Sequence, residues 1–204
     1  MPAYWERAKR ELARADAVMA AVIRSHPRAR LSSRGDPFQT LARSIVGQQI
    51  SVRAAQAVWE KLGTRLPAVT PMQTLDAGQA NLLACGLSRR KAEYLLDLAA
   101  HFVSQRVVPE RWRTMNDDAV IAELVAVRGI GRWTAEMFLI FNMLRPDVLP
   151  VDDLGLQRAV SLRYRRGRKV SETGLRRIAR VWQPWRSVAT WFLWRSLDPV
   201  PVEY

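Results

Sequence analysis

Two glycines, Gly129 and Gly131, separate two apolar helical patterns and thereby limit what this chain can fold into. Before them, apolar residues recur at helical spacing: Val120, Ile121, Leu124, Val125 and Val127. After them, a second apolar pattern starts at Arg132: Trp133, Ala135, Met137, Phe138, Ile140 and Phe141. Residues with a Cβ would enter such a tight turn only with strain. We therefore predict a helix, a turn at residues 129–131 and a second helix.

This helix-hairpin-helix, at about residues 120–143, suggests a grip on nucleic acid. A helix that begins at such a turn directs unpaired backbone N–H groups outward, where they suit a phosphate oxygen. We expect Gly129, Gly131, Arg132 and Thr134 to contact the DNA backbone, with Arg132 adding positive charge. The alternative is an ordinary turn between packed helices, because a lone G-x-G is weak evidence.

The rest of the chain also predicts helices and no strands. Helical patterns cover residues 3–25, 37–48, 52–62, 89–104, 154–164, 171–181 and 186–197. Residues 70–84 predict short helices with a turn at 76–78. Asp36, Ser51 and Ser88 precede such patterns and are typical N-cap residues. We predict an all-α fold.

Composition points to a polyanionic partner. The chain has 32 Lys and Arg residues against 19 Asp and Glu, a net charge of +13. Such an excess attracts nucleic acid, although a protein from an arginine-rich genome would look the same. Residues 89–91, Arg-Arg-Lys, begin a helix where positive charge opposes the helix dipole. They are either a solvated basic turn or another phosphate contact.

Cysteine and histidine content limits the cofactors. The single cysteine, Cys85, excludes a disulfide within the chain and a four-cysteine iron–sulfur cluster. Two histidines, His26 and His101, argue against a zinc site. The first residues lack the apolar core of a signal peptide, and no apolar run is long enough to span a bilayer. We expect a soluble, cytoplasmic, nucleoid-associated protein, with a monomer as the default.

Four separated motifs resemble the helix-hairpin-helix DNA glycosylases. They lie at residues 45–51 (IVGQQIS), 124–136 (LVAVRGIGRWTAE), 149–157 (LPVDDLGLQ) and 182–187 (WQPWRS). The resemblance spans about residues 37–197 and is strongest to the alkylated-base branch, the DNA-3-methyladenine glycosylase II type. It implies two helical subdomains flanking a cleft. Residues 35–150 would form one subdomain, and residues 1–34 with 151–204 would form the other.

The resemblance assigns the catalytic carboxylate to Asp152. Breaking an N-glycosidic bond makes the sugar resemble an oxocarbenium ion, which a nearby negative charge stabilises. Adjacent Asp153 competes for this role, and either aspartate could be a plain N-cap of the helix at Leu154. We expect Asp153 to be the cap.

A second assignment concerns the gap that a flipped nucleotide leaves in the duplex. In the family, the loop at residues 47–51 inserts a side chain there. By position this wedge is Gln49 or its neighbour Ile50, and the alternative is a plain interhelix loop. Several relatives have an aliphatic residue at the place of Gln49, so the polar side chain leaves the wedge open between the two.

The base pocket would draw on aromatic side chains. We expect Trp133, Trp194, Met137 and Trp185 to line it, although tryptophans in apolar helices are usually core residues, above all Trp185. Bifunctional relatives have a lysine at the place of Trp133, and no lysine lies between Lys91 and Lys169. This absence predicts an enzyme without lyase activity. Aromatic faces suit a positively charged alkylated base.

No cofactor is expected for the reaction itself. The resemblance suggests one monovalent cation site on the hairpin, formed by the backbone carbonyls of Val125, Val127 and Ile130. We expect no metal ligand among the side chains. The leading hypothesis is a glycosylase that releases 3-methyladenine and 7-methylguanine from duplex DNA. The alternatives are a non-catalytic DNA-binding module and a glycosylase for deaminated or oxidised bases.

Overall fold

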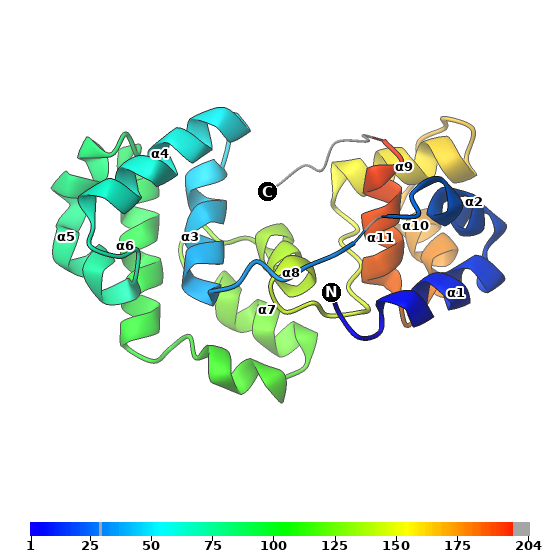
Figure 1. The fold of residues 1–204 in the computed structure, drawn as a ribbon, viewed down its shortest axis with the longest axis horizontal. Coiled ribbons are helices and arrows are strands. Elements are labelled where there is room, and N and C mark those ends of the chain that lie inside the picture. The colour runs from blue at the N-terminus through cyan, green and yellow to red at the C-terminus, as the bar shows by residue number, and fades with distance from the viewer. Residues whose placement is uncertain (29, 198–204) are drawn as a thin grey trace. The chain divides into compact units, whose positions relative to one another are not determined.

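The structure, a computed structural model, describes residues 1–28 and 30–197, and the regular elements in these ranges are all helices (Figure 1). The all-α prediction is confirmed. The α-helices are α1 (Trp5–Ala15), α2 (Ala17–Ser25), α3 (Pro37–Gly47), α4 (Val52–Arg65), α5 (Pro71–Ala84), α6 (Arg89–Val103), α7 (Asp117–Val125), α8 (Arg132–Phe141), α9 (Leu154–Tyr164), α10 (Glu172–Ile178) and α11 (Arg186–Arg195). Two short 3₁₀ helices, η1 (Pro109–Arg113) and η2 (Ala179–Trp182), complete them. Within the described ranges, no helix is long and apolar enough to cross a membrane.

The described residues pack as two compact units. Residues 34–138 form one, and residues 1–33 with 139–197 form the other, so that the division falls within α8. The observed boundary lies earlier than the expected one at residue 150. Residues after Phe138 pack with the chain ends, and one contact between them is a bidentate ion pair of Asp147 with Arg186, with Oδ1 2.7 Å from Nε and Oδ2 2.8 Å from Nη2. We call the two parts the central unit and the terminal unit.

In the central unit, α3 packs against α4 and α6, and α5 packs against α6. The predicted caps are present: Asp36, Ser51 and Ser88 accept hydrogen bonds from the backbone N–H groups of Gln39, Ala54 and Lys91. The predicted turn in α5 appears as a kink at Gly78, whose φ is 67°. Cys85, at the end of α5, is buried, and this burial raises the pKa of its thiol.

In the terminal unit, α11 packs against α1, α2 and α9. The single helix that we expected over residues 3–25 is wrong: the chain breaks at Asp16, whose backbone is extended. Asp16 ends α1 and caps α2, because its Oδ1 accepts hydrogen bonds from the N–H groups of Val18 and Met19. Its Oδ2 accepts from the Tyr164 hydroxyl at 2.7 Å and the Trp182 indole at 2.9 Å. One carboxylate thus joins α2 to α9 and η2.

Candidate functional site

The turn between α7 and α8 requires one of its two glycines. Gly129 has a φ of +88°, and a Cβ there would overlap the ring of Tyr94 on α6. Gly131 is different, because its backbone is outside the left-handed region and a Cβ would meet no atom within 4 Å. A residue with a Cβ would therefore be strained at position 129, as we expected. The same expectation is wrong for position 131. What Gly131 provides is open space beside the first turn of α8.

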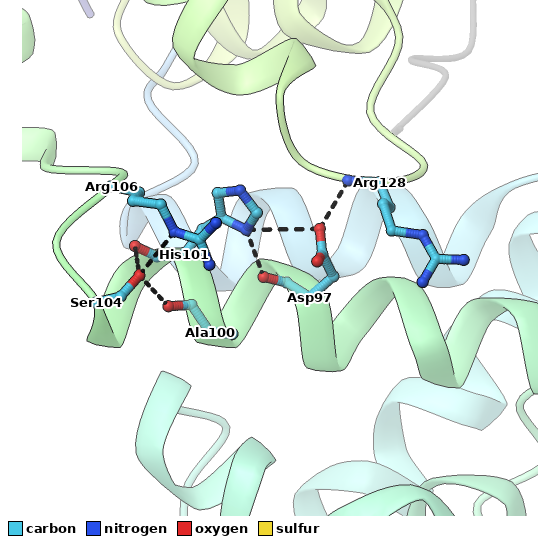
Figure 2. A network of polar contacts seen from close by, with 6 residues as sticks. All are labelled: Asp97, Ala100, His101, Ser104, Arg106 and Arg128. Carbon is cyan, nitrogen blue, oxygen red and sulfur yellow. Dashed lines mark hydrogen bonds and ion pairs between the residues drawn. The ribbon is translucent and has the colours of Figure 1, made fainter.

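The turn is held in place by side chains from other helices. The backbone N–H of Arg128 donates to Oδ2 of Asp97 on α6, at 2.8 Å (Figure 2). Figure 2 also shows His101 Nδ1 against the backbone carbonyl oxygen of Asp97, at 2.8 Å. From the end of α3, the amide of Gln48 donates to the carbonyl oxygen of Gly129, also at 2.8 Å. Contacts from two other segments of the central unit therefore converge on this turn.

The first turn of α8 offers backbone donors and one exposed cation. The N–H of Ala135 donates to the carbonyl of Gly131 at 3.0 Å, so that α8 begins there. The N–H groups of a first helical turn have no partner within the helix. Arg132 is more than half exposed and pairs with Glu136 at 3.1 Å and Asp118 at 3.6 Å. Thr134 is almost fully buried, which leaves its backbone N–H, not its hydroxyl, for the predicted phosphate contact.

The loop between α3 and α4 presents the two wedge candidates to solvent. Gln49 has a φ of 56°, unusual for a residue other than glycine, and its side chain is exposed. Ile50 is 41% exposed, although it is aliphatic. Because Gln48 is bonded to Gly129, the structure brings this loop and the hairpin turn together within the central unit.

The two adjacent aspartates lie in very different surroundings in the terminal unit. Asp153 is buried and caps α9 as expected, because its Oδ1 accepts from the N–H of Leu156 at 2.6 Å. The same oxygen accepts from the indole N–H of Trp194 at 2.7 Å. Asp152 is exposed, and within the described residues no hydrogen bond or ion pair holds its carboxylate. A Cβ on Gly155 would lie 3.1 Å from Asp153 Oδ1 and 3.1 Å from Trp194 Cδ1, so the start of α9 fits closely around this pair.

Four predicted pocket residues differ in exposure and in partners. Trp194 is half-buried and stacks on Phe141, with ring centroids 5.7 Å apart. Trp185 is buried, its N–H donates to Glu11 at 2.6 Å, and its ring stacks on Tyr4. In the central unit, Trp133 is 38% exposed and Met137 is buried. Trp194 is thus in direct contact with a carboxylate, while the contacts of Trp185 hold it in the core of its unit.

Some supporting residues gave no signal in the sequence. The roles of Tyr94 and Asp97 beside the hairpin turn, and of Phe141 beneath Trp194, depend on packing between distant segments. No local pattern links such positions. The cation site remains a prediction: of its proposed ligands, the Val127 carbonyl also accepts the N–H of Ile130 at 3.1 Å, which leaves it one further lone pair.

Comparisons with known proteins agree with this arrangement. A family model described as HhH-GPD superfamily base excision DNA repair protein matches residues 42–185. DNA-3-methyladenine glycosylase 1 of Schizosaccharomyces pombe is 29% identical over 79% of this chain and 72% of its own length. DNA-3-methyladenine glycosylase 2 of Escherichia coli is 31% identical over 83% of this chain, which spans 61% of that protein.

Solved structures are similar over nearly the whole chain. A DNA-3-methyladenine glycosidase from Bacillus halodurans matches with a TM-score of 0.84 and 32% identity, covering 92% of this chain and 87% of that one. The Schizosaccharomyces pombe 3-methyladenine DNA glycosylase Mag1, in complex with abasic DNA, matches with a TM-score of 0.79 and 26% identity, covering 93% and 96%.

Proposed function

This chain belongs to the HhH-GPD superfamily of base excision DNA repair proteins, and we propose that it is a DNA glycosylase for alkylated purines. It would bind duplex DNA as a monomer, flip the damaged base and hydrolyse its N-glycosidic bond, leaving an abasic site. The observation that carries the proposal is the hydrogen bond between buried Asp153 and half-buried Trp194, on a chain whose relatives are named 3-methyladenine glycosylases. Water is the only co-substrate, so the hydrolysis needs no cofactor.

The hairpin supports the DNA grip. A phosphate oxygen can approach the N–H groups at the start of α8, because the space beside Gly131 is open and Arg132 is exposed. Such contacts position a duplex without reading its bases. The exposed Ile50 or Gln49 would then fill the place of the flipped nucleotide, for which unstacking costs on the order of a few kcal/mol.

The chemistry needs a fixed negative charge beside a sugar that becomes cation-like. Asp153 suits this role better than the predicted Asp152, because two N–H donors orient its buried carboxylate. A charge in a buried site also acts more strongly than one exposed to water. We therefore assign the stabilising carboxylate to Asp153, with Asp152 as the alternative. The attacking water would be oriented by the same carboxylate.

The aromatic residues support the choice of substrate. A purine alkylated at N3 or N7 carries positive charge, which an indole face attracts by stacking and by cation–π interaction. Such a base is already a good leaving group and needs little acid assistance. For such a base, one carboxylate and the face of Trp194 beside it are sufficient.

We further propose that the enzyme has no lyase activity. Trp133 stands where a lyase would have its nucleophilic lysine, and no lysine occurs from residue 92 to residue 168. Incubation with abasic DNA and borohydride should trap no covalent complex. A trapped complex would disprove this part of the proposal and leave base release untouched. The expected compartment is the cytoplasm, on the nucleoid.

The test of the whole proposal is chromatography of the free bases that the protein releases from methylated duplex DNA. We expect 3-methyladenine and 7-methylguanine. No release, despite tight and salt-sensitive DNA binding, would contradict the proposal. Duplexes containing uracil, hypoxanthine or an oxidised base would then distinguish another lesion class from a non-catalytic DNA-binding module.

A further inference from the structure

One segment of the terminal unit carries a concentration of positive charge that the hairpin and the carboxylate site do not use. Between Leu154 and Ser171 the chain has six basic residues and no acidic one. They are Arg158, Arg163, Arg165, Arg166, Arg168 and Lys169. The segment comprises α9 and the loop that follows it.

Five of these six cations are exposed and have no partner within the described residues. Arg163 is the exception, since its guanidinium donates to the carbonyl oxygen of Ser196 at 2.8 Å and to the Ser196 hydroxyl at 3.3 Å. That contact ties α9 to the end of α11. By contrast, in the part of the chain that the structure describes, no hydrogen bond or ion pair holds the side chains of the other five, all of them exposed. Among residues 1–28 and 30–197, no ion pair neutralises the charge of these five side chains.

The charge lies around a hollow. A cleft of about 270 Å³ is lined by Leu154, Gln157, Arg158, Ser161, Gly167, Lys169 and Val170. Arg158 comes from α9 and Lys169 from the far side of the loop, so that two cations from different segments face one concave surface. The loop is folded back onto α9, because the N–H of Gly167 donates to the carbonyl oxygen of Ser161 at 2.9 Å.

We propose that this surface, the α9 cleft, binds the phosphate backbone of the DNA substrate at a site separate from the hairpin. The proposal rests on the glycosylase function proposed above. We use the name α9 cleft for this hollow, with its lining cations Arg158 and Lys169, together with the exposed cations of the adjoining loop, Arg165, Arg166 and Arg168. Guanidinium groups bind phosphate oxygens in a bidentate manner, and the ammonium of Lys169 adds a point charge.

The position of the cleft sets its distance from the lesion. Leu154, which lines it, directly follows Asp153, the carboxylate assigned to the sugar. The helix α9 has 11 residues and is therefore roughly 16 Å long. One strand of duplex DNA places a phosphate about every 3.4 Å along the axis. The α9 cleft would thus contact phosphates within about five nucleotides of the flipped base.

The test removes three cations and measures how DNA affinity depends on salt. The variant is Arg158→Gln/Arg168→Gln/Lys169→Gln, and the probe is a duplex with a central abasic site, followed by fluorescence anisotropy. Each lost phosphate contact reduces the slope of log K against log[salt] by roughly 0.9. We expect a slope smaller by about 2.7, so that between about 50 and 200 mM salt the wild type loses about 40-fold more affinity than the variant.

The control variant removes equal charge elsewhere in the same unit. Arg10→Gln/Arg14→Gln/Arg24→Gln replaces three exposed arginines of α1 and α2, and its slope should remain near that of the wild type. Arg158→Lys/Arg168→Lys keeps the charge and should also retain the slope. Equal slope changes in the first two variants would show a general charge effect and overturn the proposal. So would an unchanged slope in the α9 variant.

The binding measurement also separates this proposal from the proposed function. It uses an abasic duplex and needs no catalysis. If the wild type releases no base but the α9 variant loses salt-dependent affinity, the glycosylase function fails and the phosphate site stands. If release is normal and the slopes do not differ, the phosphate site fails alone.

Discussion

The side-chain amide of Gln48 donates a hydrogen bond of 2.8 Å to the carbonyl oxygen of Gly129. This bond connects the loop after α3, which exposes Gln49 and Ile50, to the turn that begins α8. A duplex held at the hairpin would therefore meet the wedge candidates at a fixed distance. The two motifs lie 81 positions apart in the chain, yet this bond brings them together in the central unit.

Replacing Gln48 should weaken this attachment. Gln48→Ala removes the side-chain donor of this hydrogen bond to the Gly129 carbonyl. Its loss should lower the free energy of unfolding by about 1 kcal/mol. It should also slow base release, because the wedge loop loses its attachment. Urea denaturation and single-turnover kinetics would measure the two effects. The control is Gln105→Asn, at an exposed glutamine with a φ of 55°, since Asn tolerates a positive φ. If Gln48→Ala behaves like this control and the wild type, the attachment has no role.

The two hairpin glycines should respond differently to a methyl group. Gly129→Ala places a Cβ at a φ of +88° and against the Tyr94 ring, so the free energy of unfolding should fall by more than about 1 kcal/mol. Gly131→Ala meets open space and should change stability by no more than about 0.5 kcal/mol. It should nevertheless weaken DNA binding, because the methyl group occupies the approach of a phosphate. Thermal unfolding and anisotropy titrations would check both, and normal DNA binding by Gly131→Ala would argue against the grip.

Asparagine variants of the two aspartates should identify the carboxylate. Asn also caps helices well, so Asp153→Asn should keep α9 folded while removing the charge. We expect base release to fall at least about 100-fold in Asp153→Asn and much less in Asp152→Asn. DNA affinity, measured alongside, should persist in both. The reverse order of the two rates would return the role to Asp152, as the sequence predicted.

Strong alkali should act partly through Tyr4. Burial raises the pKa of Tyr4 from its ordinary value of 10.0 to about 12. Because the folded protein favours the neutral hydroxyl, its contribution to stability is complete below pH 10 and is lost as the pH rises towards 12. Tyr4→Phe cannot ionise, so its melting temperature should fall less steeply over this range. Parallel slopes for the two proteins would contradict this account.

Local chemistry made much of the fold predictable. Asp36, Ser51 and Ser88 are N-caps because a short polar side chain can accept a first-turn N–H, and this signal needs no tertiary information. At Asp16 the prediction was wrong, because the apolar pattern continues without interruption through a residue that ends one helix and caps the next. Periodicity alone cannot show such a break, because α1 and α2 bury their apolar sides within one unit.

The site was harder to predict because its main contacts join distant residues. The sequence placed Asp152, Asp153 and Trp194 among the candidates, but which carboxylate meets the indole depends on how α11 packs beside α9. Gly129 was predictable from turn chemistry, whereas the ring of Tyr94 that excludes a Cβ there comes from α6. The residue types in the sequence indicate which chemistry is possible. Tertiary packing determines which of two adjacent residues of the same type makes the contact.

The single buried cysteine makes this protein a ready scaffold for site-directed labelling. Cys85 is 1% exposed, and burial raises the pKa of its thiol, so we expect it to react slowly with thiol reagents. A maleimide dye would therefore select a cysteine introduced on the surface, without removal of a native one. Placed at the exposed Ile50, such a dye would report by its emission whether and when this loop enters a duplex, as we propose.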